Sequence, residues 1–352
     1  MENPDAGARA VSDRIALSAA MLPGRPYVTG LAVAGGVGFA AAGDEAIWAF
    51  APDAGITPER ILELGALPLA VAAAPGGDGV LVGTDDGRLL KVASDGSKRL
   101  LAYQAGAWIE QIAVQPDTGR IACGVGRRVL VLDAAGVVVA EHDGHASTVA
   151  GLAFSGDGTR IAASHYGGVT VWPADRGDAI GERLEWHGSH LAVAWSPDSA
   201  FIATAMQEKE LHAWRMPHGK SLRMSGYPAK IRSLSWTPDG RYLAVGGADS
   251  VTAWDFGDGG PSGKAPLEFG YVFNQVVTEV AASPADGMIA GAYDDGAVMI
   301  GDPASGEAMI ARAGDGAAVT RLVWSDDGGT LLAGSAKGGL AVMQRRDLVA
   351  AV

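Results

Sequence analysis

The chain of 352 residues contains a single cysteine, Cys123, so it cannot form a disulfide bond within itself. Basic residues are also scarce, because 27 Lys and Arg against 40 Asp and Glu give a formal net charge of −13. Nucleic acids and anionic membrane surfaces both recruit proteins through basic surfaces. The charge balance therefore predicts that neither is a partner.

Long apolar stretches are missing as well. The longest weakly apolar stretch, residues 30–43, is short and interrupted by glycine, so it is not expected to span a membrane. Residues 1–23 carry charges of both signs and show no basic leader followed by an apolar run. These absences lead us to expect a cytoplasmic protein.

What the sequence has in abundance is glycine, with 51 residues, spaced between short apolar stretches. Residues 145–172 show the pattern most fully, as three apolar stretches separated by glycine turns at 156–158 and 167–168. Tight turns of this composition predict three short antiparallel strands. Such a unit cannot bury both of its faces alone, so it needs neighbours of its own kind.

Those neighbours follow along the chain. The apolar anchor of the unit recurs at steps of roughly 40 to 46 residues, the period of a four-stranded blade. The anchors are Leu31, Val71, Ile112, Leu152, Val193, Leu234, Val280 and Leu322. Aspartate- and glycine-containing turns recur with them, and a closing tryptophan returns at Trp48, Trp214 and Trp254. The sequence therefore predicts one ring of repeated sheets.

In these features residues 27–343 resemble the WD40-repeat β-propeller family, with degenerate repeats of a bacterial type. With eight anchors, the resemblance implies an all-β, eight-bladed β-propeller of four-stranded antiparallel blades. We expect a mobile arm at residues 1–12 and a single propeller domain at 13–352. The resemblance also implies a protein–protein interaction scaffold that presents one face of the propeller to a partner protein and is monomeric on its own.

The two ends of the chain bear on how the ring closes. Residues 13–18 resemble the fourth strands of the other repeats, yet no repeat precedes them, and the last repeat has three clear strands. Unpaired strand edges are costly, so we expect the N-terminal strand to complete the last blade. The alternative is that residues 348–352 provide that strand.

The histidines are unusually grouped, because all seven lie between residues 142 and 218. In a propeller, the loop before a first strand and the turn between second and third strands share one face, where imidazoles could converge on Zn²⁺. The candidate ligands are His145, His165, His187 and His190, with His142 in reserve. A metal-binding or metal-handling propeller is therefore the alternative function.

A structural role for His145 competes with this hypothesis. In the resembled family, the histidine of a Gly-His pair forms hydrogen bonds to an aspartate, a hydroxyl and the tryptophan. Ser164 and Trp172 could be two of these partners, but Tyr166 occupies the aspartate position. The hydrogen-bond network of the family is therefore expected to be incomplete in this repeat.

Aromatic residues precede many of the first strands and are the candidate contacts to a partner protein. The candidates are Tyr27, Trp108, Tyr227 and Tyr271. Exposed aromatic side chains contribute strongly to binding at protein interfaces, whereas buried ones would pack between the blades. For Trp108 and Tyr271 the sequence leaves both interpretations open.

Catalytic motifs are missing. The glycine pairs lie in hairpins and not between a strand and a helix, so they form no phosphate-binding loop. No Ser-His-Asp arrangement is suggested by spacing. We therefore expect a protein that is not an enzyme and has no cofactor other than the zinc of the alternative hypothesis.

Overall fold

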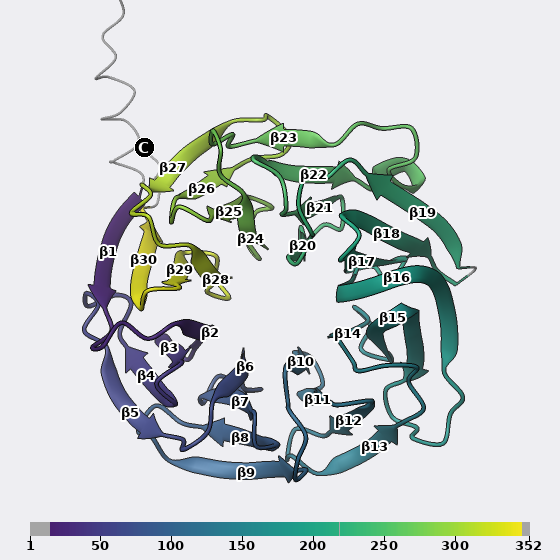
Figure 1. Cartoon of the computed structure of the whole chain (residues 1–352), viewed down its shortest axis with the longest axis horizontal. Coiled ribbons are helices and arrows are strands. Elements are labelled where there is room, and N and C mark those ends of the chain that lie inside the picture. The colour runs from purple at the N-terminus through teal and green to yellow at the C-terminus, as the bar shows by residue number, and fades with distance from the viewer. Residues whose placement is uncertain (1–14, 218, 347–352) are drawn as a thin grey trace, which may run out of the picture.

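The computed structural model describes residues 15–217 and 219–346, which form a ring of strands around a central axis (Figure 1). In these ranges the chain has thirty strands, β1 to β30, and one short 3₁₀ helix, η1 (Gly257–Gly259). The same ranges contain no helix that is long and apolar enough to cross a membrane. The predicted all-β propeller fold is confirmed.

The strands form seven antiparallel sheets, and five of these consist of four consecutive strands. The first three are β2 (Val28–Ala34), β3 (Val37–Ala42), β4 (Ala46–Phe50) and β5 (Glu59–Glu63); β6 (Pro68–Ala73), β7 (Val80–Thr84), β8 (Arg88–Val92) and β9 (Lys98–Tyr103); and β10 (Gln111–Gln115), β11 (Arg120–Val125), β12 (Arg128–Leu132) and β13 (Val138–His142). The other two are β20 (Leu234–Trp236), β21 (Tyr242–Val245), β22 (Val251–Asp255) and β23 (Leu267–Phe269); and β24 (Val277–Ala282), β25 (Ile289–Tyr293), β26 (Val298–Gly301) and β27 (Ala308–Arg312).

The largest sheet has six strands instead of four. Its strands are β14 (Gly151–Phe154), β15 (Arg160–Pro173), β16 (Glu182–Trp195), β17 (Phe201–Met206), β18 (Glu210–Arg215) and β19 (Lys220–Ser225). Counting each hydrogen-bonded sheet as one blade, the propeller has seven blades, and the prediction of eight separate four-stranded blades is wrong.

The physical reason is that the fourth and fifth repeats share a strand. β15 reverses direction at Gly167 and Gly168, so that the amide of Ala174 donates to the Thr159 carbonyl at 2.8 Å. β16 then pairs with β15 through its first half and with β17 through its second half. It continues through Gly188, which has a φ of +105°. One continuous strand therefore joins two repeats into one sheet.

All eight anchors lie on the strands that line the axis, in β2, β6, β10, β14, β16, β20, β24 and β28 (Val319–Trp324) (Figure 1). These inner strands approach closely, because a Cβ built on Gly30 of β2 would lie 2.5 Å from the Val71 Cγ2 atom of β6. Apolar side chains fill the space between sheets, and each contributes about 1.5–3 kcal/mol when fully buried. The repeat of apolar anchors in the sequence therefore predicts the positions of the inner strands correctly.

The ring closes through the N-terminal strand, as predicted. β1 (Ile15–Met21) pairs antiparallel with β30 (Gly339–Arg345), which continues through β29 (Thr330–Ser335) to β28. The register runs from Ile15 opposite Arg345 to Met21 opposite Gly339. The alternative closing segment at 348–352 and the arm at 1–12 lie outside the described residues. The outer edge of β30 is therefore occupied by β1.

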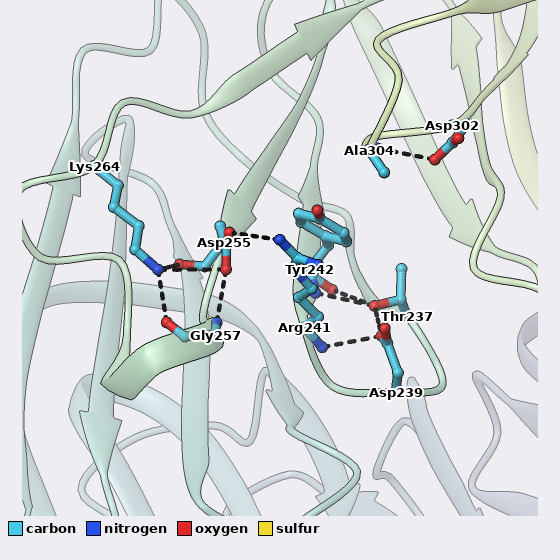
Figure 2. A network of polar contacts seen from close by, with 9 residues as sticks. All are labelled: Thr237, Asp239, Arg241, Tyr242, Asp255, Gly257, Lys264, Asp302 and Ala304. Atoms are coloured by element: carbon cyan, nitrogen blue, oxygen red, sulfur yellow. Dashed lines mark hydrogen bonds and ion pairs between the residues drawn. The ribbon is translucent and has the colours of Figure 1, made fainter.

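A Ser or Thr two residues before an Asp organises the turn after several inner strands, and Figure 2 shows the example at Thr237. The Thr237 hydroxyl donates to the Asp239 Oδ1 atom at 2.6 Å and accepts the amide of Tyr242 at 3.0 Å. The amide of Arg241 donates to the same carboxylate at 3.0 Å. These bonds fix the turn between β20 and β21.

The same view shows how residues 258–263, an insertion in the connection between β22 and β23, are held (Figure 2). The Lys264 ammonium donates to the Gly257 carbonyl at 2.6 Å and lies 3.4 Å from the Asp255 Oδ1 atom. The amide of Gly257 donates to the same carboxylate at 2.7 Å. The insertion therefore starts from a backbone that side chains fix at the end of β22.

Replacing Thr237 with valine should lower the free energy of unfolding by about 1–3 kcal/mol, because the buried amide of Tyr242 would lose its acceptor. Urea denaturation measures this change. Thr159→Val is the matched control, since the exposed Thr159 hydroxyl also donates to an aspartate of its turn but can be replaced there by water. Equal losses in the two variants would show that the buried hydroxyl has no special role.

Candidate protein interface

One end of the propeller carries the connections that lead into the inner strands, together with the turns between second and third strands. We call this end the loop face. Its connections are residues 22–27, 64–67, 104–110, 143–150, 226–233, 270–276 and 313–318, and residues 187–190 of the continuous strand β16 take the corresponding place. All the candidate partner contacts predicted from the sequence lie on these connections.

Three of the four predicted aromatic contacts are exposed. The exposed fraction is 60% for Trp108, 61% for Tyr271 and 48% for Tyr27. Tyr227 is buried, because its hydroxyl lies 3.0 Å from the Thr252 hydroxyl and accepts the Trp254 Nε1–H at 2.8 Å. The prediction that Tyr227 contacts a partner is therefore corrected. Its side chain points inward from the connection at 226–233 and packs inside the propeller.

Other exposed aromatic side chains lie on the same face and were not among the predicted contacts. Phe273 is 72% exposed and lies two residues after Tyr271. Tyr166, in the glycine-flanked turn where the resembled family has aspartate, is 65% exposed. An aromatic residue at the tip of such a turn has nothing to pack against, and this signal could have identified Tyr166 from the sequence.

Trp108 stands beside a groove. Two hollows of about 290 and 420 Å³ share Glu110, Thr148 and Val149 in their walls, so they adjoin each other. The first lies next to Trp108, and the second extends to Leu191 and Arg232. We call the two hollows together the loop-face groove. Its walls come from connections far apart in the sequence, so no local motif could have indicated it.

The loop that carries Trp108 is tied to the neighbouring turn. The amide of Gln104 donates to the Gly87 carbonyl at 2.9 Å, and the amide of Ile109 donates to the Thr84 carbonyl at 3.1 Å. The side chain of Ile109 is fully buried. Trp108 is therefore presented outward by a loop whose two ends are fixed.

Of the predicted metal ligands, the structure brings together only His145 and His165, whose ring centroids lie 5.6 Å apart. His187 is exposed, whereas His145, His165 and His190 are buried. Within residues 15–217 and 219–346, no group of three or more His, Cys, Asp or Glu side chains is placed to hold a metal ion. The hypothesis of a site formed by these four histidines is corrected, and His218 lies outside the described residues.

The buried imidazoles instead contact hydroxyls, carbonyls and tryptophans. The two ring nitrogens of His165 lie 2.8 Å from the Tyr166 carbonyl and 2.9 Å from the Thr170 hydroxyl. His190 Nδ1 lies 2.8 Å from the Thr204 hydroxyl. His145 packs edge-on against Trp172 with ring centroids 4.5 Å apart. This packing agrees with the structural role considered for His145 in the sequence analysis. Ser164 forms no hydrogen bond to His145, however.

Burial also sets the charge state of these rings. Burial, together with the nearby His165 and His142, lowers the pKa of His145 to about 4. Burial lowers the pKa of His212 to about 3, with a further contribution from His190. These two imidazoles are therefore neutral at pH 7 and belong to the packed interior.

A family described as "WD domain, G-beta repeat" matches residues 136–173, which include the repeat that organises the sequence pattern. The chain is a WD40-repeat β-propeller. A second family, "Anaphase-promoting complex subunit 4 WD40 domain", matches residues 193–255 of the propeller.

Relatives of the propeller share single regions with it. The intraflagellar transport protein 122 homolog of Xenopus tropicalis is 29% identical over 147 residues, which are 41% of this chain and 12% of the relative. WD repeat-containing protein 1 of Mus musculus is 28% identical over 162 residues, which are 45% and 26% of the two chains. The propeller therefore matches only a minor part of each of these longer proteins.

Solved structures agree in fold over nearly the whole chain. The computationally designed Ika8 protein superposes with a TM-score of 0.70 at 19% identity, covering 91% of this chain and 96% of that one. A chain of the Mitotic Checkpoint Complex superposes with a TM-score of 0.61 at 16% identity, covering 94% and 91%. At these identities the likeness concerns the fold alone.

Proposed function

We propose that this WD40 propeller is a platform that binds another protein through its loop face. The observation that carries the proposal is Trp108, a large aromatic side chain that is 60% exposed beside the loop-face groove. Tryptophan is among the residues that contribute most to binding when a partner covers them. An exposed indole next to a concave surface is suited to anchor a partner that fills the groove.

The rigidity of the support strengthens this proposal. The hydrogen bonds at Gln104 and Ile109 hold the loop before a partner arrives, so little additional chain has to be ordered on binding. The groove beside it draws its walls from several repeats, which the closed ring holds in place. The loop face therefore offers a preorganised surface to a partner.

The comparisons support binding in preference to catalysis. One matched relative is named as a subunit, the eukaryotic translation initiation factor 3 subunit I of Aspergillus oryzae, with 31% identity over 19% of this chain and 22% of the relative. One matched structure is a chain of a complex, the Mitotic Checkpoint Complex. Both of these proteins are named as parts of protein assemblies. We infer the same general role here.

The test begins with affinity purification and chemical cross-linking, which identify a partner and the face it covers. The purified partner is then titrated into wild-type protein and Trp108→Ala. We expect the variant to bind about 30-fold more weakly or worse, which corresponds to about 2 kcal/mol, with an unchanged Tm.

Leu100→Ala is the matched control, because Leu100 is 54% exposed but lies on the outer strand β9. This variant should bind like the wild type. Unchanged affinity of Trp108→Ala, or cross-links confined to the opposite face of the ring, would contradict the proposal.

A further inference from the structure

Two exposed aromatic side chains lie on the loop face away from Trp108. Tyr271 and Phe273 belong to the connection between β23 and β24, whereas Trp108 lies between β9 and β10 on the other side of the ring (Figure 1). Their exposed fractions are 61% and 72%. Neither ring is packed into the propeller, so their apolar surfaces face solvent.

The connection that carries them is held at both ends. The amide of Val272 donates to the Asp249 carbonyl at 2.9 Å, and the amide of Val276 donates to the Asp294 Oδ1 atom at 2.9 Å. The amide of Val277 donates to the Ala248 carbonyl at 2.8 Å. A fixed loop therefore presents the two rings. Binding of a ligand would cost little additional conformational entropy, because the loop is already ordered.

The residues that hold this loop are acidic. Asp249 and Asp294 are both exposed, and Glu268, just before the loop, is exposed as well. In the part of the chain that the structure describes, none of these three carboxylates forms an ion pair, whereas Arg312 is paired with Asp315 on the next connection. Negative charge beside the two rings is therefore not balanced by the protein itself.

We infer that Tyr271, Phe273, Asp249 and Asp294, here called the aromatic–acidic patch, dock a basic segment of a partner protein, with arginine as the preferred side chain. This inference rests on the proposed function and names the chemistry of the partner at a second position on the same face. Charge complementarity selects the occupant, because the patch combines exposed aromatic rings with carboxylates that form no ion pair within the described residues.

Arginine satisfies both parts of the patch. Its planar guanidinium can stack on an aromatic ring while donating two parallel hydrogen bonds to a carboxylate. An apolar segment would cover the rings but would also remove Asp249 and Asp294 from water without a partner, which is unfavourable. A nucleic acid would be repelled by the same carboxylates. A basic peptide segment is the occupant that leaves no group unsatisfied.

The experiment uses the full chain and a fluorescein-labelled Gly-Ser peptide with arginine at every third position, followed by fluorescence anisotropy. The first variant, Tyr271→Ala/Phe273→Ala, removes the rings. The second, Asp249→Asn/Asp294→Asn, removes two charges but keeps the oxygen that accepts the amide of Val276. We expect each double variant to weaken binding about 10-fold or more. The same peptide with glutamine in place of arginine should not bind.

The control must separate this patch from the general attraction of a basic peptide to a chain of net charge −13. Asp175→Asn/Asp178→Asn makes the same change of charge at two exposed aspartates on the connection between β15 and β16. We expect the affinity of this control to stay within about twofold of the wild type. Equal losses in the patch and control variants would overturn the inference.

The outcome is also independent of the test on Trp108. Trp108→Ala should leave binding of the arginine peptide unchanged, because Trp108 lies on a different connection of the ring. If a partner binds through Trp108 but the arginine peptide ignores the patch, the inference fails and the proposed function stands. If the peptide binds at the patch but no partner depends on Trp108, the proposed use of the groove fails.

Discussion

Ser18→Pro should lower the free energy of unfolding by about 3 kcal/mol and promote aggregation, because proline removes a hydrogen bond that closes the ring. The amide of Leu22 donates to the Gly338 carbonyl at 2.9 Å. Hydrogen-bonded pairs alternate along an antiparallel ladder, so Ser18 and its partner Val342 form such a pair as well. The variant would leave the Val342 carbonyl without a hydrogen bond and would weaken the pairing of β1 with the edge of β30.

Ala19→Pro is the matched control. Ala19 lies opposite Ala341 in the alternate type of pair, so its amide points away from β30. Proline is tolerated on an edge strand at such positions, and we expect a loss of about 1 kcal/mol or less. Urea denaturation and light scattering measure stability and aggregation. If Ser18→Pro unfolds like the wild type, β1 does not stabilise the closed ring.

Acidification from pH 7 to pH 5 should lower the free energy of unfolding by about 4 kcal/mol through His145 and His212. Their pKa values in the folded protein are about 4 and about 3, below the ordinary value of 6.5. The unfolded chain therefore binds more protons in this range, so stability rises with pH and is lost as the pH falls below about 6.5. The carboxylates titrate mainly at lower pH.

Urea denaturation at pH 7, 6 and 5 measures this dependence, and one substitution isolates a single ring. His212→Phe keeps an aromatic ring against Trp186, with which His212 stacks at a centroid distance of 4.0 Å. It should remove about half of the loss between pH 7 and pH 5. A flat profile for the wild type would contradict the assignment.

Much of the fold was predictable because a propeller repeats its inner strands at a regular period. The anchor positions, from Leu31 to Leu322, all lie on inner strands, and the unpaired strand near residue 15 could be assigned to the last sheet. The number of separate sheets could not be read in this way. Whether a strand stops or continues at Gly188 depends on the pairing of β16 with both β15 and β17, which are contacts across the sheet.

The candidate interface was predicted less well, because position on a connection does not determine exposure. Trp108 and Tyr271 are exposed, whereas Tyr227 occupies a similar connection and is buried by its hydrogen bonds to Thr252 and Trp254. The histidines are grouped in the sequence, and the rings of His145 and His165 lie 5.6 Å apart, but within the described residues no three of them are placed to share a metal ion. The local sequence pattern could therefore indicate that these residues lie on the loop face. It could not indicate which side chains are buried by packing against other strands.

The continuous strand β16 also determines where the ring can deform. Sheets that meet only through side chains can rock against each other as the propeller breathes, whereas the two repeats joined by β16 share backbone hydrogen bonds on both sides of Gly188. Leu191, in the wall of the loop-face groove, lies on this strand. That wall therefore moves as one unit with both repeats, and the groove can widen when the connections that carry Trp108 and Arg232 shift relative to it.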